Sequence, residues 1–218
     1  LDEGEYRAEN VRIEAARFVF DIRHPEGVCE GVALPIPGFH NAENATAAFA
    51  ACRAVGLSPD EIREGLNHYR GVKRRFEYQV QRPDLVYIDD YAHHPTEISA
   101  FLKSVRALYP ERKLTAIFQP HLFSRTRDFL DGFADALSET DELVLLDIYP
   151  AREQPIPGIT SELLLDKVRS SDKLLQKKAQ VLDWLRDRPI EVLVTIGAGD
   201  IDQLVHSIRT LLEARKPA

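Results

Sequence analysis

The sequence has 218 residues, of which 44% are hydrophobic and 29% are charged, a balance typical of one or two globular domains with a real core. Its 28 Lys and Arg against 35 Asp and Glu leave a net charge of −7, which argues against nonspecific nucleic-acid binding because that activity needs a basic surface. Two cysteines, Cys29 and Cys52, exclude a disulfide framework and a four-cysteine zinc site.

Membrane insertion and export are also disfavoured. No apolar run approaches the 18 residues of a membrane span. The first ten residues carry three Glu and one Asp, where a secretory signal needs a cationic start and an apolar stretch. We therefore expect a cytoplasmic protein with no membrane partner. Because the sequence lacks Met and starts at Leu1, we also expect it to be a piece of a longer protein or to lack its first residues.

The first seventy residues are expected to form strands followed by two helices. Loose alternation of apolar and polar residues up to residue 22 predicts strands. Glycines and prolines over residues 27–38 then predict turns with a short extended piece. An Ala-rich helix is expected over residues 41–55. A Ser-Pro-Asp-Glu stretch starting at Ser58 predicts the start of a second helix, which ends before Gly71.

From about residue 79 the pattern becomes strand–helix–strand. Short Val/Ile/Leu runs alternating with helical segments favour a mostly parallel, doubly wound sheet with helices on both faces, so the fold class is α/β. The expected strands cover residues 85–88, 114–118, 143–148 and 192–196. The expected helices cover residues 95–108, 126–137, 161–168, 181–186 and 201–214.

A basic cluster marks the junction between these two parts. Lys73, Arg74 and Arg75 follow directly after the expected second helix and its loop. We place a domain boundary around residues 72–78, which gives domains of residues 1–73 and 74–218. A cation at this junction could reach an anionic ligand, although three charges in a row are also typical of a solvated surface.

Ligands of such a sheet bind beyond the carboxyl ends of its strands. The segments that follow the four expected strands are residues 89–95, 119–127, 147–153 and 197–200. They contain three of the seven histidines and three arginines, together with several carboxylates. The sequence therefore predicts a polar cleft at one edge of the sheet.

The first of these segments is the richest in chemical groups. Asp89, Asp90, Tyr91, His93 and His94 lie within seven residues that end in a proline. Such groups suit acid–base work, metal binding or hydrogen bonds to a ribose. They could instead cap a turn and a helix start. Two adjacent carboxylates beside two adjacent imidazoles favour a functional role, but nothing fixes a metal geometry, so no metal site is predicted.

The second segment carries cations at a helix start. His121, Arg125 and Arg127 could bind a carboxylate or a phosphate, helped by the helix dipole. The alternative is a solvated helix start in which Arg127 pairs with Asp128 or Asp131.

Two further patterns leave alternatives open. Asn41 and Asn44 lie three residues apart on one helix face and could hold the edge of a purine, or could simply cap the helix. The Gly-Ala-Gly-Asp stretch at residues 197–200 lacks the third glycine of a dinucleotide fingerprint and favours a tight turn with Asp200 capping the last helix. No Gly-x4-Gly-Lys-Ser/Thr P-loop occurs in the sequence.

Taken together and in this order, the motifs resemble those of the Mur ligase family over about residues 5–212. They are His40-Asn41-x-x-Asn44, Gly71-Val72-Lys73-Arg74-Arg75-Phe76, Asp89-Asp90-Tyr91-Ala92-His93-His94-Pro95-Thr96-Glu97, and Phe118-Gln119-Pro120-His121 through Arg125-Thr126-Arg127-Asp128. The resemblance implies that residues 1–73 are the C-terminal part of a central ATP-binding domain. It also implies that residues 74–218 form a Rossmann-like C-terminal ligase domain.

The resemblance also implies a reaction in peptidoglycan precursor synthesis. The motifs are most similar to those of the member in which ATP phosphorylates the carboxylate of UDP-N-acetylmuramate and the amine of L-alanine then attacks the acyl phosphate. ATP and Mg²⁺ are the implied cofactors, with the metal ligands mainly in a missing part. An N-terminal UDP-sugar domain and the P-loop half of the central domain would be missing as well. We expect this chain alone to be inactive.

The site residues carried over by the resemblance fall into two groups. Asn41 and Asn44 would hold the adenine, Arg75 would reach the ATP phosphates and Asp90 would hold the ribose. Tyr91, His93, His121 and Arg125 would face the muramoyl carboxylate and the incoming alanine, with Arg75, His93, His121 and Arg125 as the catalytic set. Many family members have Arg where this sequence has Leu122, which removes one implied substrate contact.

Two other functions remain open at this point. A sister ligase that attaches a recycled murein tripeptide to the same sugar nucleotide shares the Asp-Asp-x-Ala-His-His-Pro type of block. A non-catalytic nucleotide-binding module could use the same loops without turnover.

Overall fold

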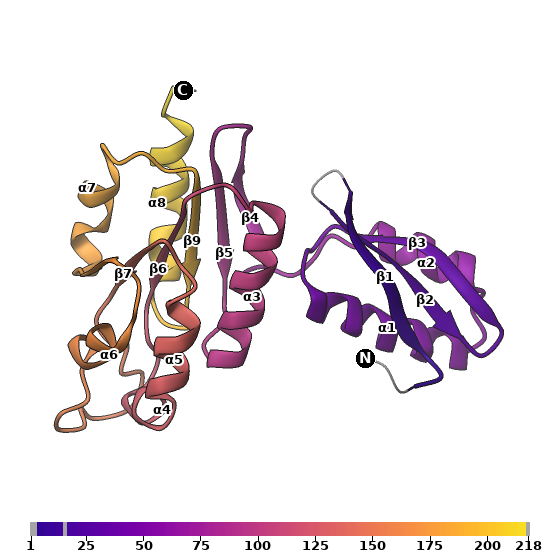
Figure 1. Cartoon of the computed structure of the whole chain (residues 1–218), viewed down its shortest axis with the longest axis horizontal. Coiled ribbons are helices and arrows are strands. Elements are labelled where there is room, and N and C mark those ends of the chain that lie inside the picture. Colours follow the sequence, from indigo (N-terminus) through magenta and orange to yellow (C-terminus); the bar gives the residue numbers. More distant parts are fainter. Residues whose placement is uncertain (1–3, 15–16, 217–218) are drawn as a thin grey trace. The chain divides into compact units, whose positions relative to one another are not determined.

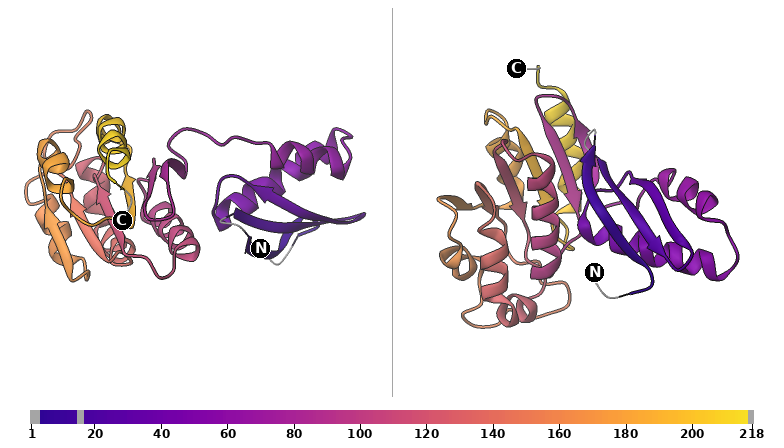
Figure 2. Two further views of the ribbon diagram at one scale, coloured as in Figure 1. Left: turned by 90° about the horizontal axis from the view of Figure 1, so that it is seen from above. Right: turned by 45° about the vertical axis from the view of Figure 1, so that its right-hand side comes forward.

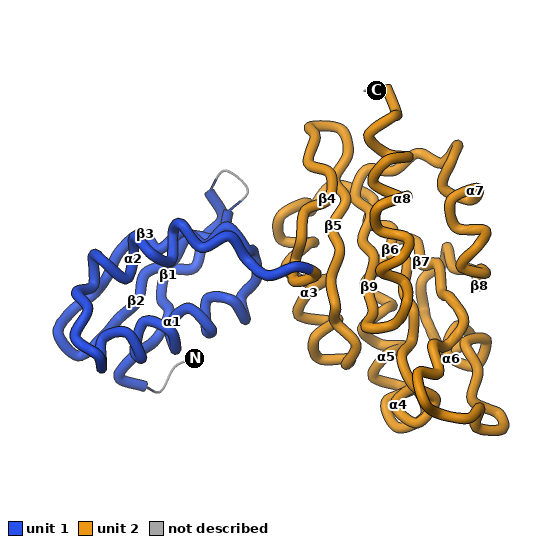
Figure 3. Tube along the Cα trace, turned by 180° about the vertical axis from the view of Figure 1, so that it is seen from behind, with its two compact units in different colours: residues 1–73 blue, residues 74–218 orange. Residues whose placement is uncertain are grey.

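The computed structural model describes residues 4–14 and 17–216 (Figure 1). The chain divides into two compact units, residues 1–73 and residues 74–218 (Figure 3). Leu1, on which the expectation about the start of the sequence rests, lies outside the described residues. Within the described part, no helix is long and apolar enough to cross a membrane.

The first unit packs two helices against a small antiparallel sheet (Figures 1 and 2). Its strands run in the order β1 (Arg7–Glu14), β2 (Arg17–His24) and β3 (Gly27–Leu34). The helices are α1 (Phe39–Ala54) and α2 (Pro59–Asn67). Phe20 and Ile22 of β2 and Phe49 of α1 are fully buried in the core between sheet and helices.

The start of α2 is as the sequence predicts. The Ser58 hydroxyl accepts a hydrogen bond from the Glu61 N–H, and the Glu61 carboxylate accepts one from the Ser58 N–H. This reciprocal capping box satisfies two amide groups that the first turn of a helix leaves without partners.

The expectation of turns over residues 27–38 is wrong for its first part, because residues 27–34 form a full strand. The Asp21 carboxylate accepts a hydrogen bond of 2.9 Å from the Gly31 N–H. The pairing of β2 with β3 shifts at this point, and Gly31 has a φ of 71°. The glycine therefore sits at a bulge inside a strand, where a positive φ is needed, and does not end the strand.

The second unit is a three-layer α/β structure (Figures 1 and 2). Its six strands are ordered β4-β5-β9-β6-β7-β8, and all pairs are parallel except β4 with β5. The strands are β4 (Glu77–Gln81), β5 (Val86–Asp90), β6 (Leu114–Phe118), β7 (Glu142–Leu145), β8 (Asp172–Leu175) and β9 (Val192–Ile196). The predicted mostly parallel α/β sheet is thus confirmed.

Helices cover both faces of this sheet. They are α3 (Pro95–Leu108), α4 (Phe123–Asp128), α5 (Leu130–Leu137), α6 (Ser161–Lys167), α7 (Val181–Leu185) and α8 (Asp202–Glu213), with a short 3₁₀ turn at Lys178–Gln180. Helices α3, α5 and α6 lie on one face, and α7 and α8 on the other (Figures 1 and 2). The layer beneath α7 and α8 buries Tyr87, Ile117 and Leu193 completely.

The single helix expected over residues 126–137 is wrong, because the structure has two. Phe129 lies between α4 and α5 with φ −120° and ψ 24°, outside helical geometry. Phe129 is 42% exposed, and its ring centroid lies 4.5 Å from that of His94. The chain therefore turns at Phe129, and the phenylalanine is not on the buried face of α5.

Candidate functional site

Four loops meet at the carboxyl edge of the parallel sheet, because the strands that they follow are neighbours. β9 lies between β5 and β6, and β7 lies beside β6. The loops that leave β5 and β6 lead to helices on one face, whereas the loop that leaves β9 leads to α8 on the other. This reversal is where open α/β sheets bind their ligands.

Four rings from three of these loops form a continuous row, here called the ring row. The Tyr91 and His93 ring centroids are 5.3 Å apart, and those of His93 and His121 are 6.3 Å apart. His121 in turn stacks on Tyr149, at 5.7 Å with an interplanar angle of 25°. The structure therefore brings Tyr91 and His93 of one predicted segment together with His121 of another.

Cations lie beside two members of the ring row, His121 and Tyr91. The Arg125 guanidinium lies with Nη1 3.4 Å from His121 Nδ1. The guanidinium carbons of Arg74 and Arg75 are 5.1 and 5.8 Å from the Tyr91 ring centroid. Arg75 and Arg125 thus lie where an anionic ligand beside the ring row would meet them.

Arg127 does not join this cluster. Its Nε donates to Asp128 at 2.7 Å on an exposed surface, which is the solvated pairing that the sequence left as the alternative.

Arg74 has a different environment from its two basic neighbours. It donates to the fully buried Asp89 carboxylate at 3.0 Å and to the Gly197 carbonyl at 2.6 Å. Burial raises the pKa of Asp89, and hydrogen bonds from Thr195 and Arg74 oppose that rise. Arg74 is therefore a half-buried partner that fixes the start of the second unit against β5 and the end of β9, while Lys73 and Arg75 are exposed.

Asp90 is held by the backbone on both sides. One carboxylate oxygen accepts from the Phe76 N–H and the other from the Ala92 N–H, each at 2.8 Å. Burial raises the pKa of Asp90 to about 6, although these two hydrogen bonds and the Arg75 charge lower it. Asp90 thus shapes the loop that carries Tyr91 and His93, and its role toward a ribose stays a prediction.

Glu97, which the sequence places only in the first turn of α3, organises the His-His segment. Its carboxylate accepts from the backbone N–H groups of His93 at 3.0 Å and His94 at 3.3 Å. It also lies 3.6 Å from His93 Nδ1. Burial alone would raise the pKa of Glu97, but these hydrogen bonds and the nearby charges of His93 and Arg75 lower it below its usual value.

Tyr149 is the site residue that sequence reasoning missed. Its N–H donates to the Pro120 carbonyl at 2.8 Å, and its own carbonyl accepts from the Leu122 N–H at 2.9 Å. These two bonds bracket His121 and hold it in the stack. Leu122 has a φ of 73°, a strained value for a branched side chain, and the bonds around it maintain that conformation. The only signal for Tyr149 was its place just after the third expected strand.

His121 is partly removed from water in this arrangement. Burial, followed by the positive charges of Arg125 and His93, lowers its pKa below the usual value for histidine. Its surroundings therefore favour the neutral imidazole over the charged one.

The glycine turn after β9 packs tightly against the same loops, but the expected cap is wrong. The Ile201 N–H at the start of α8 donates to the Gln119 side chain at 2.8 Å, so Gln119 supplies the contact expected of Asp200. Asp200 instead accepts from Gln119 Nε2 at 2.8 Å and pairs with Lys178. A Cβ on Gly199 would lie 2.5 Å from Gln119 Oε1 and 2.8 Å from Tyr149 Cβ. The turn needs glycine because these side chains are so close.

The two asparagines lie on α1 of the first unit. Asn41 donates from Nδ2 to the Pro37 carbonyl at 2.8 Å, and the N-cap position of α1 is Gly38 with no side-chain cap, so the structure does not show the helix capping that was the alternative for these residues. Asn44 is exposed. Their role toward adenine stays a prediction.

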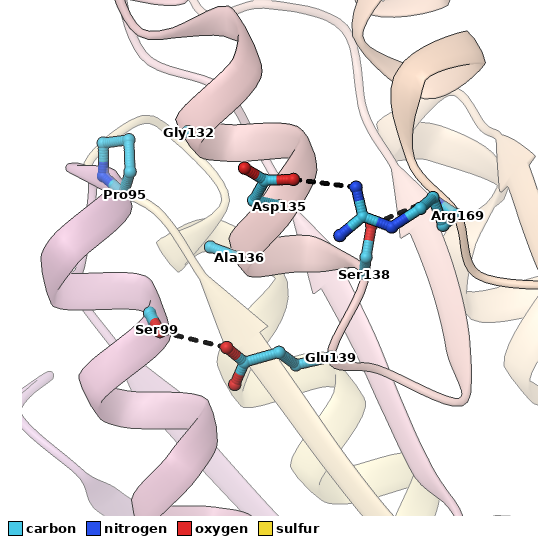
Figure 4. Close-up of a pocket in the computed structure, with 8 residues that line it drawn as sticks. All are labelled: Pro95, Ser99, Gly132, Asp135, Ala136, Ser138, Glu139 and Arg169. Carbon is cyan, nitrogen blue, oxygen red and sulfur yellow. Dashed lines mark hydrogen bonds and ion pairs between the residues drawn. The ribbon is translucent and has the colours of Figure 1, made fainter.

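Two other kinds of site, a metal site and a cleft, were considered among the described residues. Within residues 4–14 and 17–216, no group of three or more His, Cys, Asp and Glu side chains could hold a metal ion. A cleft of about 440 Å³ lies between α3, α5 and the end of α6, and its charged groups pair with each other (Figure 4). Arg169 pairs there with Asp135, and Ser99 donates to Glu139.

A mostly parallel α/β domain with imidazole and guanidinium groups at its switch point is of the class that binds ligands beyond the carboxyl ends of its strands, and its cations suit an anionic ligand. Residues 74–202 match the family described as "Mur ligase, glutamate ligase domain". The match covers more than half of the sequence. The chain belongs to the Mur ligase family.

Individual relatives agree with this assignment. The chain is 48% identical over 211 residues to the UDP-N-acetylmuramate–L-alanine ligase of Flavobacterium johnsoniae, covering 97% of this chain and 47% of that protein. It is also 48% identical over 215 residues to the enzyme of that name from Phocaeicola vulgatus, covering 98% and 47%. The chain thus spans about half the length of the curated relatives that it matches.

A solved structure gives the same picture. The UDP-N-acetylmuramate–alanine ligase of Thermotoga maritima superposes with a TM-score of 0.83 at 25% identity, covering 99% of this chain and 47% of that one. A murein peptide ligase from Psychrobacter arcticus has a TM-score of 0.63 at 20% identity, which shows the shared fold alone.

Proposed function

We propose that this chain is the C-terminal part of an ATP-dependent ligase that joins L-alanine to UDP-N-acetylmuramate through an acyl phosphate, in cytoplasmic synthesis of peptidoglycan precursors. The observation that carries the proposal is the cluster of Tyr91, His93, His121 and Arg125 at the switch point of the sheet, in a chain 48% identical to two ligases of that name. Residues 1–73 would then be the end of the central ATP-binding domain, and residues 74–218 the complete C-terminal domain.

The chemistry of the cluster suits this reaction. An amino acid brings a carboxylate, and the reaction develops negative charge on an acyl group and on the departing phosphate. Arg125 and Arg75 offer guanidinium groups for these anions. Closure of missing domains over this edge would exclude the remaining water.

ATP is the proposed source of the activating phosphate. Asn41 and Asn44 would contact its adenine, Arg75 its phosphates and Asp90 its ribose. The Asn41 amide and both Asp90 oxygens already have backbone partners, so each would reach the nucleotide through its remaining hydrogen-bonding capacity. Mg²⁺ is the proposed metal cofactor, with its ligands mainly in the part of the longer protein that lies outside this sequence.

The experiment that tests the proposal uses the longer protein containing this chain. Purified protein is given ATP, Mg²⁺ and UDP-N-acetylmuramate, with either L-alanine or the murein tripeptide as amine donor, and the amide product is detected by mass spectrometry. The proposal expects product with L-alanine only. Product with the tripeptide only would support the sister ligase, and nucleotide binding without product would support a non-catalytic module.

The 218-residue chain alone serves as the matched control. Its sequence has no P-loop, so we expect no phosphate release from ATP with both substrates present. Robust turnover by this chain would contradict the proposal that ATP hydrolysis needs the P-loop part of the longer protein.

A further inference from the structure

The hydrogen bonds of His93 determine which of its nitrogens carries the proton. His93 Nδ1 lies 3.0 Å from the Tyr91 carbonyl oxygen, and a carbonyl can only accept. Nδ1 must therefore be the protonated nitrogen that donates. The Glu97 carboxylate, 3.6 Å from the same nitrogen, favours the same arrangement. In the neutral ring this leaves Nε2 with a lone pair.

His121 is set the opposite way by Arg125. Arg125 Nη1 lies 3.4 Å from His121 Nδ1, and a guanidinium can only donate. His121 Nδ1 must therefore accept, and in the neutral ring the proton is on Nε2. The lowered pKa of His121 is in keeping with a neutral ring. The stack on Tyr149 and the two backbone bonds around His121 hold the ring in this orientation.

We propose that these two neighbouring imidazoles hold opposite tautomers that divide the handling of the incoming amino acid between them. His93 Nε2 accepts a proton from the α-ammonium group, and His121 Nε2–H donates with Arg125 to the α-carboxylate. Tyr149 is a positioning residue that holds the His121 ring. This inference rests on the proposed function, which it deepens by assigning a separate role to each histidine.

The spacing supports such a division. The two ring centroids are 6.3 Å apart, and the α-ammonium and α-carboxylate of an amino acid are separated by a single carbon atom. An amino acid placed beside both rings can therefore reach one with each group. Arg125 on the His121 side supplies the positive charge that a carboxylate prefers, so the polarity of the site fixes which end of the amino acid faces which ring.

The resulting step is balanced in atoms and charge. The α-ammonium group gives one proton to His93 Nε2 and becomes an amine. The amine lone pair forms a C–N bond to the carbonyl carbon of the acyl phosphate, and the C–O bond to phosphate breaks with its electron pair passing to the phosphate. The phosphate takes the second proton from nitrogen, leaving a neutral amide and hydrogen phosphate.

The charged groups around the two rings come from every neighbouring segment. Glu97 of α3 and Arg75 before β4 lie on the His93 side. Arg125 of α4 and Glu153 after β7 lie on the His121 side, where Glu153 weakly opposes the lowering of the His121 pKa. The tautomer of each ring thus follows from the group that its Nδ1 meets, a carbonyl oxygen at His93 and a guanidinium at His121.

Nitrogen NMR tests the tautomers directly on this chain without any substrate. Long-range ¹H–¹⁵N spectra of the ¹⁵N-labelled protein at about pH 8.5, two units above the ordinary imidazole pKa of about 6.5, distinguish protonated from unprotonated ring nitrogens. We expect the unprotonated nitrogen to be Nε2 in His93 and Nδ1 in His121. The same tautomer in both rings, or the reverse assignment, would overturn the proposal. Backbone-directed assignment of the wild-type chain removes any need for a variant in this step.

Binding of L-alanine tests the assigned roles. A Gln at position 121 keeps an amide N–H near the place of Nε2, whereas an Asn keeps one near Nδ1, so His121→Gln and His121→Asn form a matched pair. In NMR titrations of this chain, we expect H121Q to bind L-alanine within about threefold of wild type and H121N to bind at least tenfold more weakly. Equal losses in the two variants would overturn the donor role of Nε2.

Two further arms separate this inference from the proposed function. Replacing L-alanine by L-alaninamide removes the carboxylate, so it should abolish the difference between H121Q and H121N if the inference is right. A difference that persists would overturn it. Failure of the proposed function would show instead as no amide product from the longer protein, with the tautomers of this chain unaffected.

Two variants test whether Tyr149 positions His121. Tyr149→Phe should keep the His121 spectrum, whereas Tyr149→Leu should raise the His121 pKa toward its ordinary value. Identical spectra in the two variants would exclude positioning by the stack.

Discussion

Asp90→Asn should remove a pH dependence of stability that the buried Asp90 carboxyl gives the wild-type protein. Asp90 is 7% exposed, and its two oxygens accept from the Phe76 and Ala92 N–H groups. An Asn side chain has one acceptor oxygen, so one of these amides loses its partner. Leaving a buried donor unsatisfied costs about 1–3 kcal/mol. At low pH, where Asp90 is protonated in both states, the variant should be less stable than wild type or close to it.

The pH dependence has the opposite sign from that of a salt-bridged carboxylate. The pKa of Asp90 is raised from 3.8 to about 6 in the folded state, so the folded protein binds this proton more tightly than the unfolded chain does. Stability from this group is therefore greatest below the unfolded pKa and falls as pH rises through the interval up to about 6. At about 1.4 kcal/mol for each pKa unit, the fall is about 3 kcal/mol.

Trp184, the one tryptophan of the chain, makes the measurement specific to the second unit. Urea unfolding followed by its fluorescence gives the free energy of unfolding of wild type and D90N between pH 4 and pH 8. Because the unfolded-state carboxyl is already about half ionised at pH 4, the difference between the two proteins should shift by about 2.5 kcal/mol in favour of the variant across this range. Exposed Asp166 on α6 gives a matched control, and Asp166→Asn should change stability by no more than about 0.5 kcal/mol. A difference that is constant with pH, or that moves in favour of wild type as pH rises, would refute the reasoning.

Three further predictions concern close packing, capping and thiol burial. Gly199→Ala should lower the free energy of unfolding by about 1–3 kcal/mol, because the new Cβ would lie 2.8 Å from Tyr149 Cβ. Gly65→Ala on α2, which has open space around it, should instead raise it by roughly 0.5–1 kcal/mol. Urea and thermal unfolding measure both changes, and equal effects would contradict the packing argument. Ser58→Ala removes the capping box and should cost about 1 kcal/mol in a calorimetric or dichroism melt, so an unchanged transition of the first unit would count against it. Cys29 is buried, and burial raises the pKa of its thiol, so alkylation of the native protein should modify Cys52 alone, whereas alkylation of the denatured protein should modify both cysteines. Mass spectrometry counts the modified thiols, and rapid labelling of both in the native protein would show that Cys29 is accessible.

The strands that could be predicted are those that the fold buries on both faces. Residues 86–90, 114–118 and 192–196 are buried throughout, so their apolar runs are visible in the sequence alone. β4 and β8 escaped prediction because they lie at the two edges of the sheet. β4 buries one residue of five and β8 none of four, which leaves no apolar period to detect.

In the candidate site, the residues proposed to face a ligand could be predicted from the sequence, but the residues that hold them in place could not. Tyr91, His93, His121 and Arg125 were found because polar residues directly after strands of a parallel sheet collect at one edge. Their supporting residues were not found, because a pattern gives residue types and not hydrogen-bond partners. Glu97 looks like an ordinary first-turn acid, and nothing in the sequence indicates that Tyr149 stacks on an imidazole 28 positions earlier.

The position of β9 also determines when the second unit can become whole during synthesis. β9 pairs with both β5 and β6, so residues 192–196 fill the gap between strands that are made about a hundred residues earlier. Until that segment leaves the ribosome, β5 and β6 have no common neighbour and each exposes an unpaired edge. The loops that carry His93 and His121 therefore acquire their final spacing only after nearly the whole chain has been translated. A nascent or truncated chain that stops before β9 holds every predicted substrate-facing residue and yet cannot assemble the site.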